Sequence, residues 1–404
     1  MLNNPDYVTA RGILLDTAAA VGAEQTPLSK SGGRVLARDL TAAEPVPPFD
    51  RSPYDGYALR ASDTVHASKK TPVTLRVLEE IPAGRVPAAA VKEGTAAKVL
   101  TGAPIPEGAD AVIKYERTVF TDETVTVFCP LAQGENIVRA GEDVRRGDVL
   151  AHSGNVIDPG TAGALAAQGV TAPLVYRVPK VGILSTGSEL VDAGEVPRPG
   201  KIRNSNRHML EAALTSMGCE PVWLGTAEDS AEKICALIQR GLSECDAVIS
   251  TGGVSAGDYD LTPDAMEKAG VELLFRGVDM KPGMACACGV RNGKIVCGLS
   301  GNPASSMTSF YVVAVPAFKK MMGYRSPLPR EIQVKLSQDF DKESHSTRFL
   351  RGRLELKDGM AWMALSKNQG NVVLSSMIGC DMMALIPAGS GPISAGTVLR
   401  GFFL

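Results

Sequence analysis

An alternation of apolar strand-like runs with helix-like runs over residues 179–301 constrains the fold of this chain more than any other feature. Val181–Ser185 and Ala247–Ser250 are short, continuous apolar runs, which are typical of strands buried on both faces. Ser205–Met217 and Ala231–Leu242 carry apolar residues at helical spacing. Alternation of this kind predicts a doubly wound, mostly parallel sheet with right-handed crossovers.

Two of these strands run into loops of small, hydroxyl-bearing and acidic residues. Residues 186–189 read Thr-Gly-Ser-Glu, and residues 251–260 read TGGVSAGDYD. Loops at the carboxyl ends of parallel strands meet at one edge of the sheet, where α/β proteins bind ligands. Backbone N–H groups and hydroxyls there suit phosphate-like oxygens, while Asp258 and Asp260 suit a divalent cation. For either loop alone, a tight turn with solvated acids is the alternative. The predicted crevice is lined by Thr186, Gly187, Glu189, Gly252, Gly253, Ser255 and Asp260.

Two further features of this region favour an anion. Met280–Gly283 offers the Lys281 cation on a turn stiffened by proline, and Gly298–Ser306 leads into a helix predicted over Ala304–Met321. Small residues at a helix N-terminus expose N–H groups that attract negative charge. The chain contains neither a P-loop string nor a dinucleotide-binding fingerprint, so ATPase and dehydrogenase functions lose their usual support.

The remainder of the chain predicts three more domains. Prolines from Pro45 to Pro48 break all regularity, and β-rich runs with Gly/Pro loops follow as far as Pro130. After residue 325 short strands and turns return, which favours a small β-barrel or sandwich. The predicted fold class is multidomain α/β plus β: a central doubly wound, mostly parallel sheet domain (178–325), an inserted β-rich domain (45–136), an N-terminal mixed domain (1–44 and 137–177) and a C-terminal β-barrel (326–404).

The net charge and the lengths of the apolar runs argue against nucleic-acid and membrane partners. The 404 residues carry a formal net charge of −2, without the basic excess of a nucleic-acid binder. The N-terminus lacks the pattern of a secretory signal, and no apolar run approaches membrane-spanning length, so we expect a cytoplasmic protein without a membrane partner. Cys286 and Cys288 are the closest pair of cysteines, and buried free thiols are the favoured interpretation over a metal site.

Taken in order, a set of short strings resembles the molybdopterin molybdenumtransferase family, which includes the E domain of gephyrin. The resemblance covers essentially the whole chain and rests on Pro47–Asp50, Asp55–Ala58, Thr101–Pro104, Gly141–Asp143, Leu184–Leu190, Ser205–Asn206, Gly252–Ser255, Lys281–Gly283 and Gly301–Pro303. It implies an elongated four-domain chain that dimerises, with the Asp55 loop completing the site of the other subunit. It also implies that adenylylated molybdopterin and molybdate react, with Mg²⁺ present, to give molybdenum cofactor and AMP.

The resemblance further implies roles for individual residues. The expected catalytic acids are Asp55, Asp143, Glu189, Asp229 and Asp260, and the expected Mg²⁺ ligands are Glu189, Asp258 and Asp260. The expected substrate-binding residues are Thr101, Thr186, Gly187, Gly252, Gly253, Ser255, Lys281, Gly301, Asn302, Ser305 and Arg351. For any single acid, a helix cap or a solvated loop remains the alternative role.

The chain departs from the family's pattern at several positions. Ser188 and Asn204 stand where Asp is common, Gly277 and Met284 where a basic residue is frequent, and Asn371 where Ser is expected. A specialised paralogue that inserts tungstate or acts on a modified pterin is therefore an alternative function. A non-catalytic scaffold on the same fold is a third, which the presence of Asp55, Asp143, Glu189 and Asp260 disfavours. Other proteins of cofactor biosynthesis are possible partners.

Overall fold

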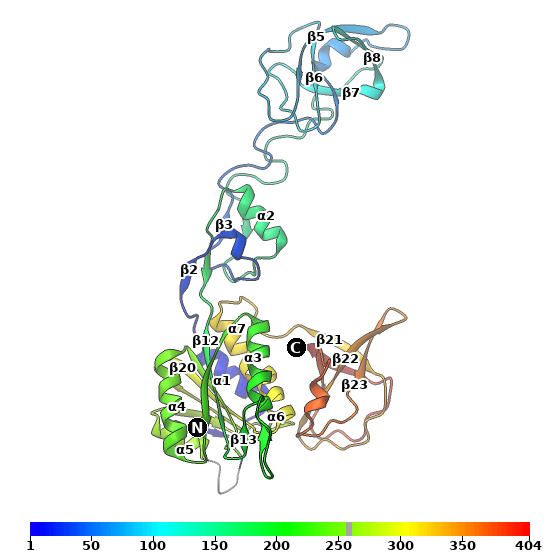
Figure 1. Cartoon of the computed structure of the whole chain (residues 1–404). Helices are drawn as coiled ribbons and strands as arrows, with labels where there is room; N and C mark the ends of the chain where they lie inside the picture. The colour runs from blue at the N-terminus through cyan, green and yellow to red at the C-terminus, as the bar shows by residue number, and fades with distance from the viewer. Residues whose placement is uncertain (256–260) are drawn as a thin grey trace. The chain divides into compact units, whose positions relative to one another are not determined.

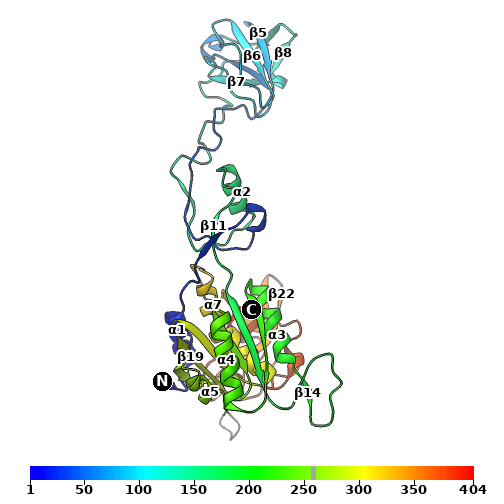
Figure 2. The same cartoon turned by 60° about the vertical axis from the view of Figure 1, so that its left-hand side comes forward.

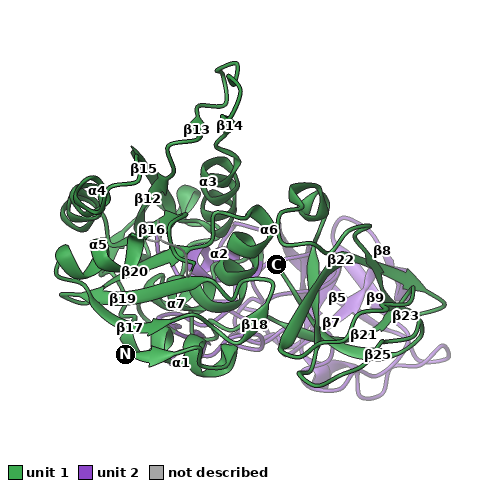
Figure 3. Cartoon of the chain, turned by 90° about the horizontal axis from the view of Figure 1, so that it is seen from below, with its two compact units in different colours: residues 1–38, 153–159, 172–404 green, residues 39–152, 160–171 purple. Residues whose placement is uncertain are grey.

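The computed structural model describes residues 1–255 and 261–404. The chain forms two compact units, green and purple in Figure 3. Unit 1 comprises residues 1–38, 153–159 and 172–404, and unit 2 comprises residues 39–152 and 160–171. The structure divides into these two compact units, and the division of the chain into four domains stays a prediction.

The centre of unit 1 is a seven-stranded sheet, counted over the described residues, with the order β1-β17-β19-β20-β16-β12-β15. Strands β20, β16, β12 and β15 pair in parallel, whereas β19 pairs antiparallel with both β20 and β17. The predicted mostly parallel sheet is therefore present. On one side β19 runs antiparallel, and β17 and β1 beyond it run in the same direction as the four central strands. Its strands are β1 (Leu2–Asn3), β12 (Lys180–Thr186), β15 (Glu220–Ala227), β16 (Ala247–Thr251), β17 (Glu272–Arg276), β19 (Cys286–Arg291) and β20 (Lys294–Leu299).

Helices cover both faces of this sheet, as Figure 3 shows from below. On one face, α4 (Ala231–Glu244) and α5 (Thr262–Lys268) pack on a core that includes Leu184, Val248 and Val296. The opposite face carries α1, α3, α6 and α7 over a second core, and the buried Cys286 and Cys288 belong to it as free thiols, as predicted. These helices are α1 (Tyr7–Thr17), α3 (Ser205–Met217), α6 (Pro303–Ser309) and α7 (Val315–Met321).

Two helices differ from the sequence-based expectation. The helix predicted over Val8–Val21 ends at Thr17, because the Val21 N–H bonds the Met321 carbonyl of α7 at 3.1 Å instead of continuing the helix. The helix predicted over Ala304–Met321 contains a π-helical turn at Phe310–Ala314 between α6 and α7. Pro316 follows this turn, and its missing N–H removes one bond of the α-helical ladder.

The C-terminal part of unit 1 is a closed barrel, which confirms that part of the predicted fold (Figure 1, orange to red). Its strands run in the order β22-β23-β21-β25-β24, and pairing between β24 and β22 closes the ring. The short strand β18 (Met280–Lys281) pairs in parallel with β22 from outside the ring. The barrel strands are β21 (Glu331–Leu336), β22 (Thr347–Lys357), β23 (Met360–Leu365), β24 (Met382–Ile386) and β25 (Val398–Phe403), with a 3₁₀ turn at Leu374–Met377.

Unit 1 also contains small two-stranded sheets. Strand β2 (Ala23–Gln25) pairs antiparallel with β11 (Leu174–Tyr176), beside a 3₁₀ turn at Leu28–Lys30. Strands β13 (Leu190–Val191) and β14 (Ile202–Arg203) pair in parallel at the base of a loop that projects beyond α3 (Figures 2 and 3). This loop follows the carboxyl end of β12, where the sequence predicts a site.

Unit 2 is built on a six-stranded sheet, counted over the described residues, with the order β7-β4-β6-β5-β9-β8. Apolar residues pack on both of its faces, so the predicted β-rich region has its own core. Its strands are β4 (Gly56–Leu59), β5 (Val73–Ile81), β6 (Thr95–Val99), β7 (Ala111–Lys114), β8 (Thr118–Phe120) and β9 (Thr124–Val127). The remaining described elements of unit 2 are the separate pair β3 (Leu40–Thr41) and β10 (Val149–Ala151), 3₁₀ turns at Ala61–Thr64 and Tyr115–Arg117, and α2 (Pro159–Ala167).

Within the described ranges, none of the helices is long and apolar enough to span a membrane.

Candidate active site

Three parallel strands of unit 1 bring the predicted loops together at one edge of the sheet. Ser185 of β12 lies in register with Thr251 of β16, and Thr251 lies in register with Leu299 of β20. The loops that begin at Thr186, Gly252 and Ser300 are therefore neighbours. The predicted meeting of the loops at the carboxyl ends of the strands is observed for their described residues.

Gly252 allows the two loops to approach closely. Its φ of +99° lies in a region that L side chains rarely adopt, and a Cβ atom there would lie 2.6 Å from the Thr186 carbonyl oxygen. Its N–H donates to the Leu299 carbonyl at 2.9 Å. Any other residue would therefore strain the backbone or push the β12 and β16 loops apart.

These loops form part of the wall of a cavity of about 980 Å³ in unit 1. Most of the predicted residues of unit 1 lie in this wall. They are Thr186, Gly187, Glu189, Asp229, Gly252, Gly253, Ser255, Lys281, Gly301, Asn302 and Ser305.

The acidic side of the cavity is formed by Glu189 and Asp229. Asp229 follows β15, and its Oδ2 accepts a hydrogen bond from the Ser188 N–H at 3.2 Å, which ties it to the β12 loop. Lys201 Nζ donates to the Ser188 carbonyl, and the Ile202 N–H donates to the Glu189 carbonyl at 2.9 Å. The backbone around Glu189 is thus held in place while its exposed carboxylate lies in the cavity wall.

The basic side of the cavity carries Lys281, which lies in β18. Pairing of Lys281 with Arg348 of β22 attaches this lysine to the edge of the barrel. The turn after it is fixed to α6, because Ser309 Oγ donates to the Gly283 carbonyl at 2.9 Å. Met284 also lies in the wall and is 59% exposed, so its thioether occupies surface where the family resemblance predicts a cation.

The start of α6 meets a loop of the barrel. Asn302 is the N-cap of α6 but makes no side-chain capping bond, and the Ser305 N–H donates to the Asn371 carbonyl at 3.3 Å. Asn371 and Val372 extend the cavity wall from the barrel side. The position at which the sequence departs from the expected serine is therefore part of the cavity.

Arg351 does not line the cavity and lies behind this barrel loop. Its side chain is fully buried, with Nη2 donating to the Gly370 carbonyl at 3.1 Å and Nε to Ser376 Oγ at 2.9 Å. Nη1 is buried without a partner in the described part of the chain, and burial lowers the pKa of Arg351 to about 10. It remains a cation at neutral pH, and its direct contact with substrate stays a prediction.

The predicted site residues of unit 2 lie at two places: Asp55 contacts Thr101, and Asp143 lines a separate depression. Asp55 Oδ1 accepts hydrogen bonds from the Thr101 N–H at 2.7 Å and the Thr101 hydroxyl at 2.8 Å. These two donors hold the pKa of Asp55 below its usual value. Asp143 lines a different depression of about 420 Å³, beside Arg51. The catalytic roles of Asp55, Thr101 and Asp143 stay predictions.

Asp258 and Asp260, the two acids that close the predicted crevice, lie outside the described residues. Among the residues on either side of this gap, no group of three His, Cys, Asp or Glu side chains is placed to hold a metal ion. The cavity wall nevertheless presents the Glu189 and Asp229 carboxylates, and such hard oxygen donors fit Mg²⁺. The carboxylate oxygens of the described residues are thus the kind of ligand that the implied Mg²⁺ prefers.

Several residues that line the cavity in the structure were not predicted from the sequence to belong to the site. They are Leu190, Ile202, Arg203, Asn204, Ser205, Asn206, Met280, Ser346 and Val372. Ser205 and Asn206 belong to a string that supported the family resemblance, but their neighbours in the β13–β14 loop carry no recognisable local pattern. The apposition of this loop and the barrel, which sequence spacing does not reveal, brings these residues together.

Comparison with known families matches three models along the chain. Residues 6–169 match the MoeA N-terminal region (domain I and II), residues 182–320 match a probable molybdopterin binding domain, and residues 333–400 match the MoeA C-terminal region (domain IV). The three models follow one another in the order that the sequence strings predict.

Individual relatives agree with these matches. A molybdopterin molybdenumtransferase of Staphylococcus aureus is 36% identical over 385 residues, which cover 95% of this chain and 91% of the relative. A Staphylococcus epidermidis enzyme of the same name is 35% identical over 373 residues, which cover 92% and 89%. The crystal structure of a molybdopterin biosynthesis MoeA protein from Pyrococcus horikoshii superposes with a TM-score of 0.85 at 32% identity, covering 99% of this chain and 100% of that one.

Proposed function

The chain belongs to the molybdopterin molybdenumtransferase family, and on this premise we propose that it inserts molybdate into adenylylated molybdopterin and releases AMP, with Mg²⁺ bound. The observation that carries this proposal is one cavity of about 980 Å³ at the carboxyl ends of β12, β16 and β20. It joins carboxylates, hydroxyl groups and a cation in one wall. A phosphorylated pterin and an oxyanion need this combination of groups.

The glycine loops suit the phosphate groups of the substrate. Gly187, Gly252 and Gly253 line the cavity with positive φ, and atoms of Glu189, Thr186 and Thr262 fill the space that their side chains would take, so the loops fold tightly along this edge of the sheet. The Ser255 hydroxyl adds a donor at the same edge of the sheet, whereas the Thr186 hydroxyl already donates to the Thr251 carbonyl at 3.4 Å. We assign these residues to binding the phosphoanhydride in a fixed orientation, which turns its cleavage into a reaction within one complex.

Lys281 suits the oxyanion. Its side chain is exposed, and no described residue forms an ion pair or hydrogen bond with it. An ammonium group attracts a tetrahedral dianion most strongly where little competing charge surrounds it. The Ser305 hydroxyl and the Asn371 amide lie in the same wall and offer further donors.

Glu189, with Asp258 and Asp260, would hold Mg²⁺, which neutralises negative charge that develops on phosphate oxygens. Asp229 is assigned a positioning role, because its carboxylate already accepts the Ser188 N–H. The remaining acids, Asp55 and Asp143, complete the proposed set from unit 2. We further propose that the enzyme works as a homodimer in the cytoplasm, which light scattering and cell fractionation would test.

The experiment incubates purified protein with adenylylated molybdopterin, MgCl₂ and molybdate, and measures AMP by chromatography and pterin-bound molybdenum by mass spectrometry. Equal amounts of AMP and bound metal are expected, and chelation of Mg²⁺ should stop both. The Glu189→Gln variant, which keeps the size of the side chain, should release little AMP. Wild-type protein that forms neither product would refute the proposal.

Tungstate insertion is the second candidate, because two positions of the wall, Met284 and Asn371, depart from the family's pattern. A parallel reaction with tungstate separates the two. Faster AMP release with tungstate than with molybdate at equal concentration would favour the second candidate, and the reverse would exclude it as the main activity.

A further inference from the structure

Two asparagine side chains in the cavity wall carry polar atoms without a partner in the described chain. Asn204 is 3% exposed and Asn206 is 8% exposed, and both line the cavity. Asn204 Nδ2 and Asn206 Oδ1 are buried, and no hydrogen bond reaches either atom. Buried polar groups in native proteins are nearly always paired, so two unpaired atoms in one wall call for an explanation.

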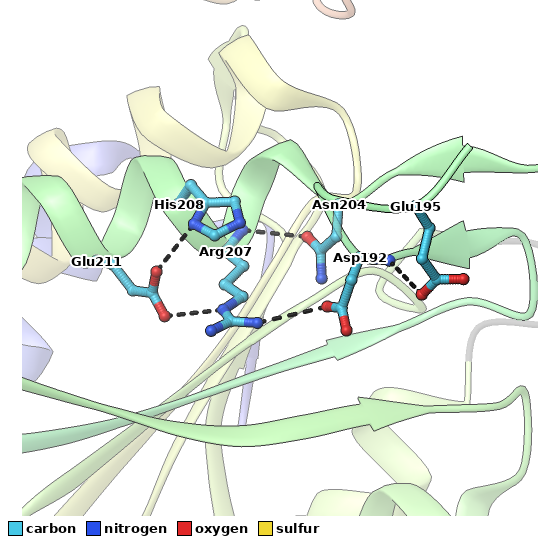
Figure 4. Close-up of polar contacts among 6 residues, drawn as sticks. All are labelled: Asp192, Glu195, Asn204, Arg207, His208 and Glu211. Atoms are coloured by element: carbon cyan, nitrogen blue, oxygen red, sulfur yellow. Dashed lines mark hydrogen bonds and ion pairs between the residues drawn. The ribbon is translucent and has the colours of Figure 1, made fainter. Parts of the chain in front are cut away.

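The amide orientations follow from the bonds that the other atom of each group makes. The Arg207 N–H donates to Asn204 Oδ1 at 3.1 Å, which caps α3 (Figure 4). Asn206 Nδ2 donates to the Gly301 carbonyl at 2.8 Å. Turning either amide over would place donor against donor or acceptor against acceptor. Asn204 therefore offers an N–H donor, and Asn206 offers a carbonyl acceptor.

Nearby charges do not use these atoms. Arg207 bonds Glu211 at 2.8 Å and Asp192 at 3.4 Å, and Figure 4 shows both contacts beside Asn204. The Asp192 N–H bonds Glu195 at 3.2 Å. The charged side chains around the start of α3 thus pair with one another, and among the described residues Asn204 Nδ2 and Asn206 Oδ1 are left without a partner.

We propose that Asn204 and Asn206 recognise the edge of a heterocycle that carries a hydrogen-bond acceptor beside an N–H donor. This inference rests on the proposed function, whose substrate contains two rings with such an edge. In a pterin the edge is the 4-oxo group beside N3–H, and in adenine it is N1 beside the 6-amino group. Neither asparagine atom is exposed in the free protein, so a small shift of the wall accompanies binding.

Asn204→Ser removes the Nδ2 donor without introducing a charge. Serine caps helices as well as asparagine does, since its hydroxyl can accept the Arg207 N–H, but it lacks Nδ2. Asn204→Asp also keeps the cap and loses the donor. Asp6→Ser is the matched control, because Asp6 caps α1 through the Val8 and Thr9 N–H groups and does not line the cavity. Thermal unfolding verifies that all variants are folded.

Binding of 6-hydroxymethylpterin and of AMP is measured separately by calorimetry. Asn204→Ser and Asn204→Asp should weaken one ligand, or both, by about tenfold to a hundredfold, as expected for a lost buried hydrogen bond. Weakening of the pterin alone assigns the edge to the pterin, and weakening of AMP alone assigns it to adenine. Methylation of the pterin at N3, or of the 6-amino group of AMP, should weaken wild-type binding of that ligand if Asn206 accepts its N–H.

Unchanged affinity for both ligands in both Asn204 variants, or no binding of either ligand to wild-type protein, would overturn the inference. So would an equal loss in Asp6→Ser. The test is separable from that of the proposed function. Normal metal insertion with unchanged ligand affinity in Asn204→Ser refutes only this inference, whereas absent insertion with weakened heterocycle binding refutes only the transferase reaction.

Discussion

The cavity of unit 1 and the Asp55 loop of unit 2 hold their charges in opposite ways. Within the described chain, the carboxylate of Glu189 and the ammonium of Lys281 have no hydrogen-bond or ion-pair partner, although each backbone is fixed by neighbouring segments. Asp55 instead receives two hydrogen bonds from Thr101 on one oxygen. The cavity thus keeps charge available for a ligand, whereas Asp55 is kept ionised by hydrogen bonds from the loop that follows β6.

The difference follows from topology. Parallel strands place successive loops at one edge of a sheet, so charged residues of separate loops can line one cavity without pairing with one another. In unit 2, β4 pairs antiparallel with β6, and Gly56 lies in register with Val99, so the loop before β4 and the loop after β6 meet at one edge of the sheet. Asp55 therefore lies within hydrogen-bond distance of Thr101, although the two residues are 46 positions apart in the sequence.

Lys281→Met gives the sharpest test of unpaired charge in the cavity. Loss of the cation should lower kcat/KM for molybdate-dependent AMP release by about 100-fold or more, as removal of a single oxyanion donor does. Lys268→Met is the control, because Lys268 forms an exposed ion pair with Glu232 at 2.6 Å and lies outside the cavity wall. Equal activity of the two variants would remove Lys281 from the site.

Asp55→Asn tests whether the Asp55 carboxylate of unit 2 takes part in the reaction. The amide oxygen can still accept both Thr101 hydrogen bonds, so the loop should stay folded while kcat/KM falls by about tenfold to a hundredfold. Asp122→Asn, in the turn between β8 and β9, makes the same charge change at an exposed position. Full activity of Asp55→Asn would remove Asp55 from the reaction.

Gly252→Ala tests how closely the β12 and β16 loops must approach. The new Cβ atom would meet the Thr186 carbonyl, so the free energy of unfolding should fall by about 1–3 kcal/mol and substrate affinity should fall with it. Gly194→Ala is the control, since no atom lies within 4 Å of a Cβ built there. Chemical denaturation and substrate titration provide the measurements. If Gly252→Ala had the stability and the substrate affinity of wild-type protein, the close approach of the two loops would be contradicted.

Thr101→Val gives the smallest expected effect and concerns the pKa of Asp55. The variant loses the hydroxyl donor but keeps the backbone N–H, so the pKa of Asp55 should rise part of the way toward about 3.9. Because the folded pKa is depressed, stability from this group is present above the unfolded value and is lost as pH falls through the folded value. As the pH falls, the Thr101→Val variant should therefore lose the stability that ionised Asp55 contributes at a higher pH than wild-type protein does.

Carbon-detected NMR titration measures this pKa directly. Thr74→Val serves as the control, because the Thr74 hydroxyl bonds Thr126 and no carboxylate. A pKa of Asp55 that is equal in Thr101→Val and in wild-type protein would show that the hydroxyl contributes nothing to holding the charge.

Much of the fold of unit 1 is predictable because its signals are local. The helix Ser205–Met217 is observed with the predicted bounds, since it has an asparagine N-cap and a glycine at its C-cap with φ +89°. The π-turn at Phe310–Ala314 and the early end of α1 are not predictable in this way. Both depend on contacts with segments far away in the sequence or on how a proline is accommodated.

The candidate site is predictable to a similar degree. Glycines, hydroxyls and acids after apolar runs identify the loops at Thr186 and Gly252, and the parallel topology then requires them to meet. Arg351 illustrates the limit, because sequence cannot reveal that this arginine is buried behind the Asn371 loop. The unpaired amide of Asn204 is equally invisible, since pairing is a property of three-dimensional surroundings.

The sequence by itself determined the class of each region, the strand ends that carry the polar loops, and the family. These follow from periodicity and from short strings, which act over a few residues. The tertiary structure alone decided which charges stay unpaired, since burial and partners depend on packing between distant segments. It attached Lys281 to the barrel through β22, enclosed Arg351, and left Asn204 Nδ2 and Asn206 Oδ1 without partners in the cavity wall.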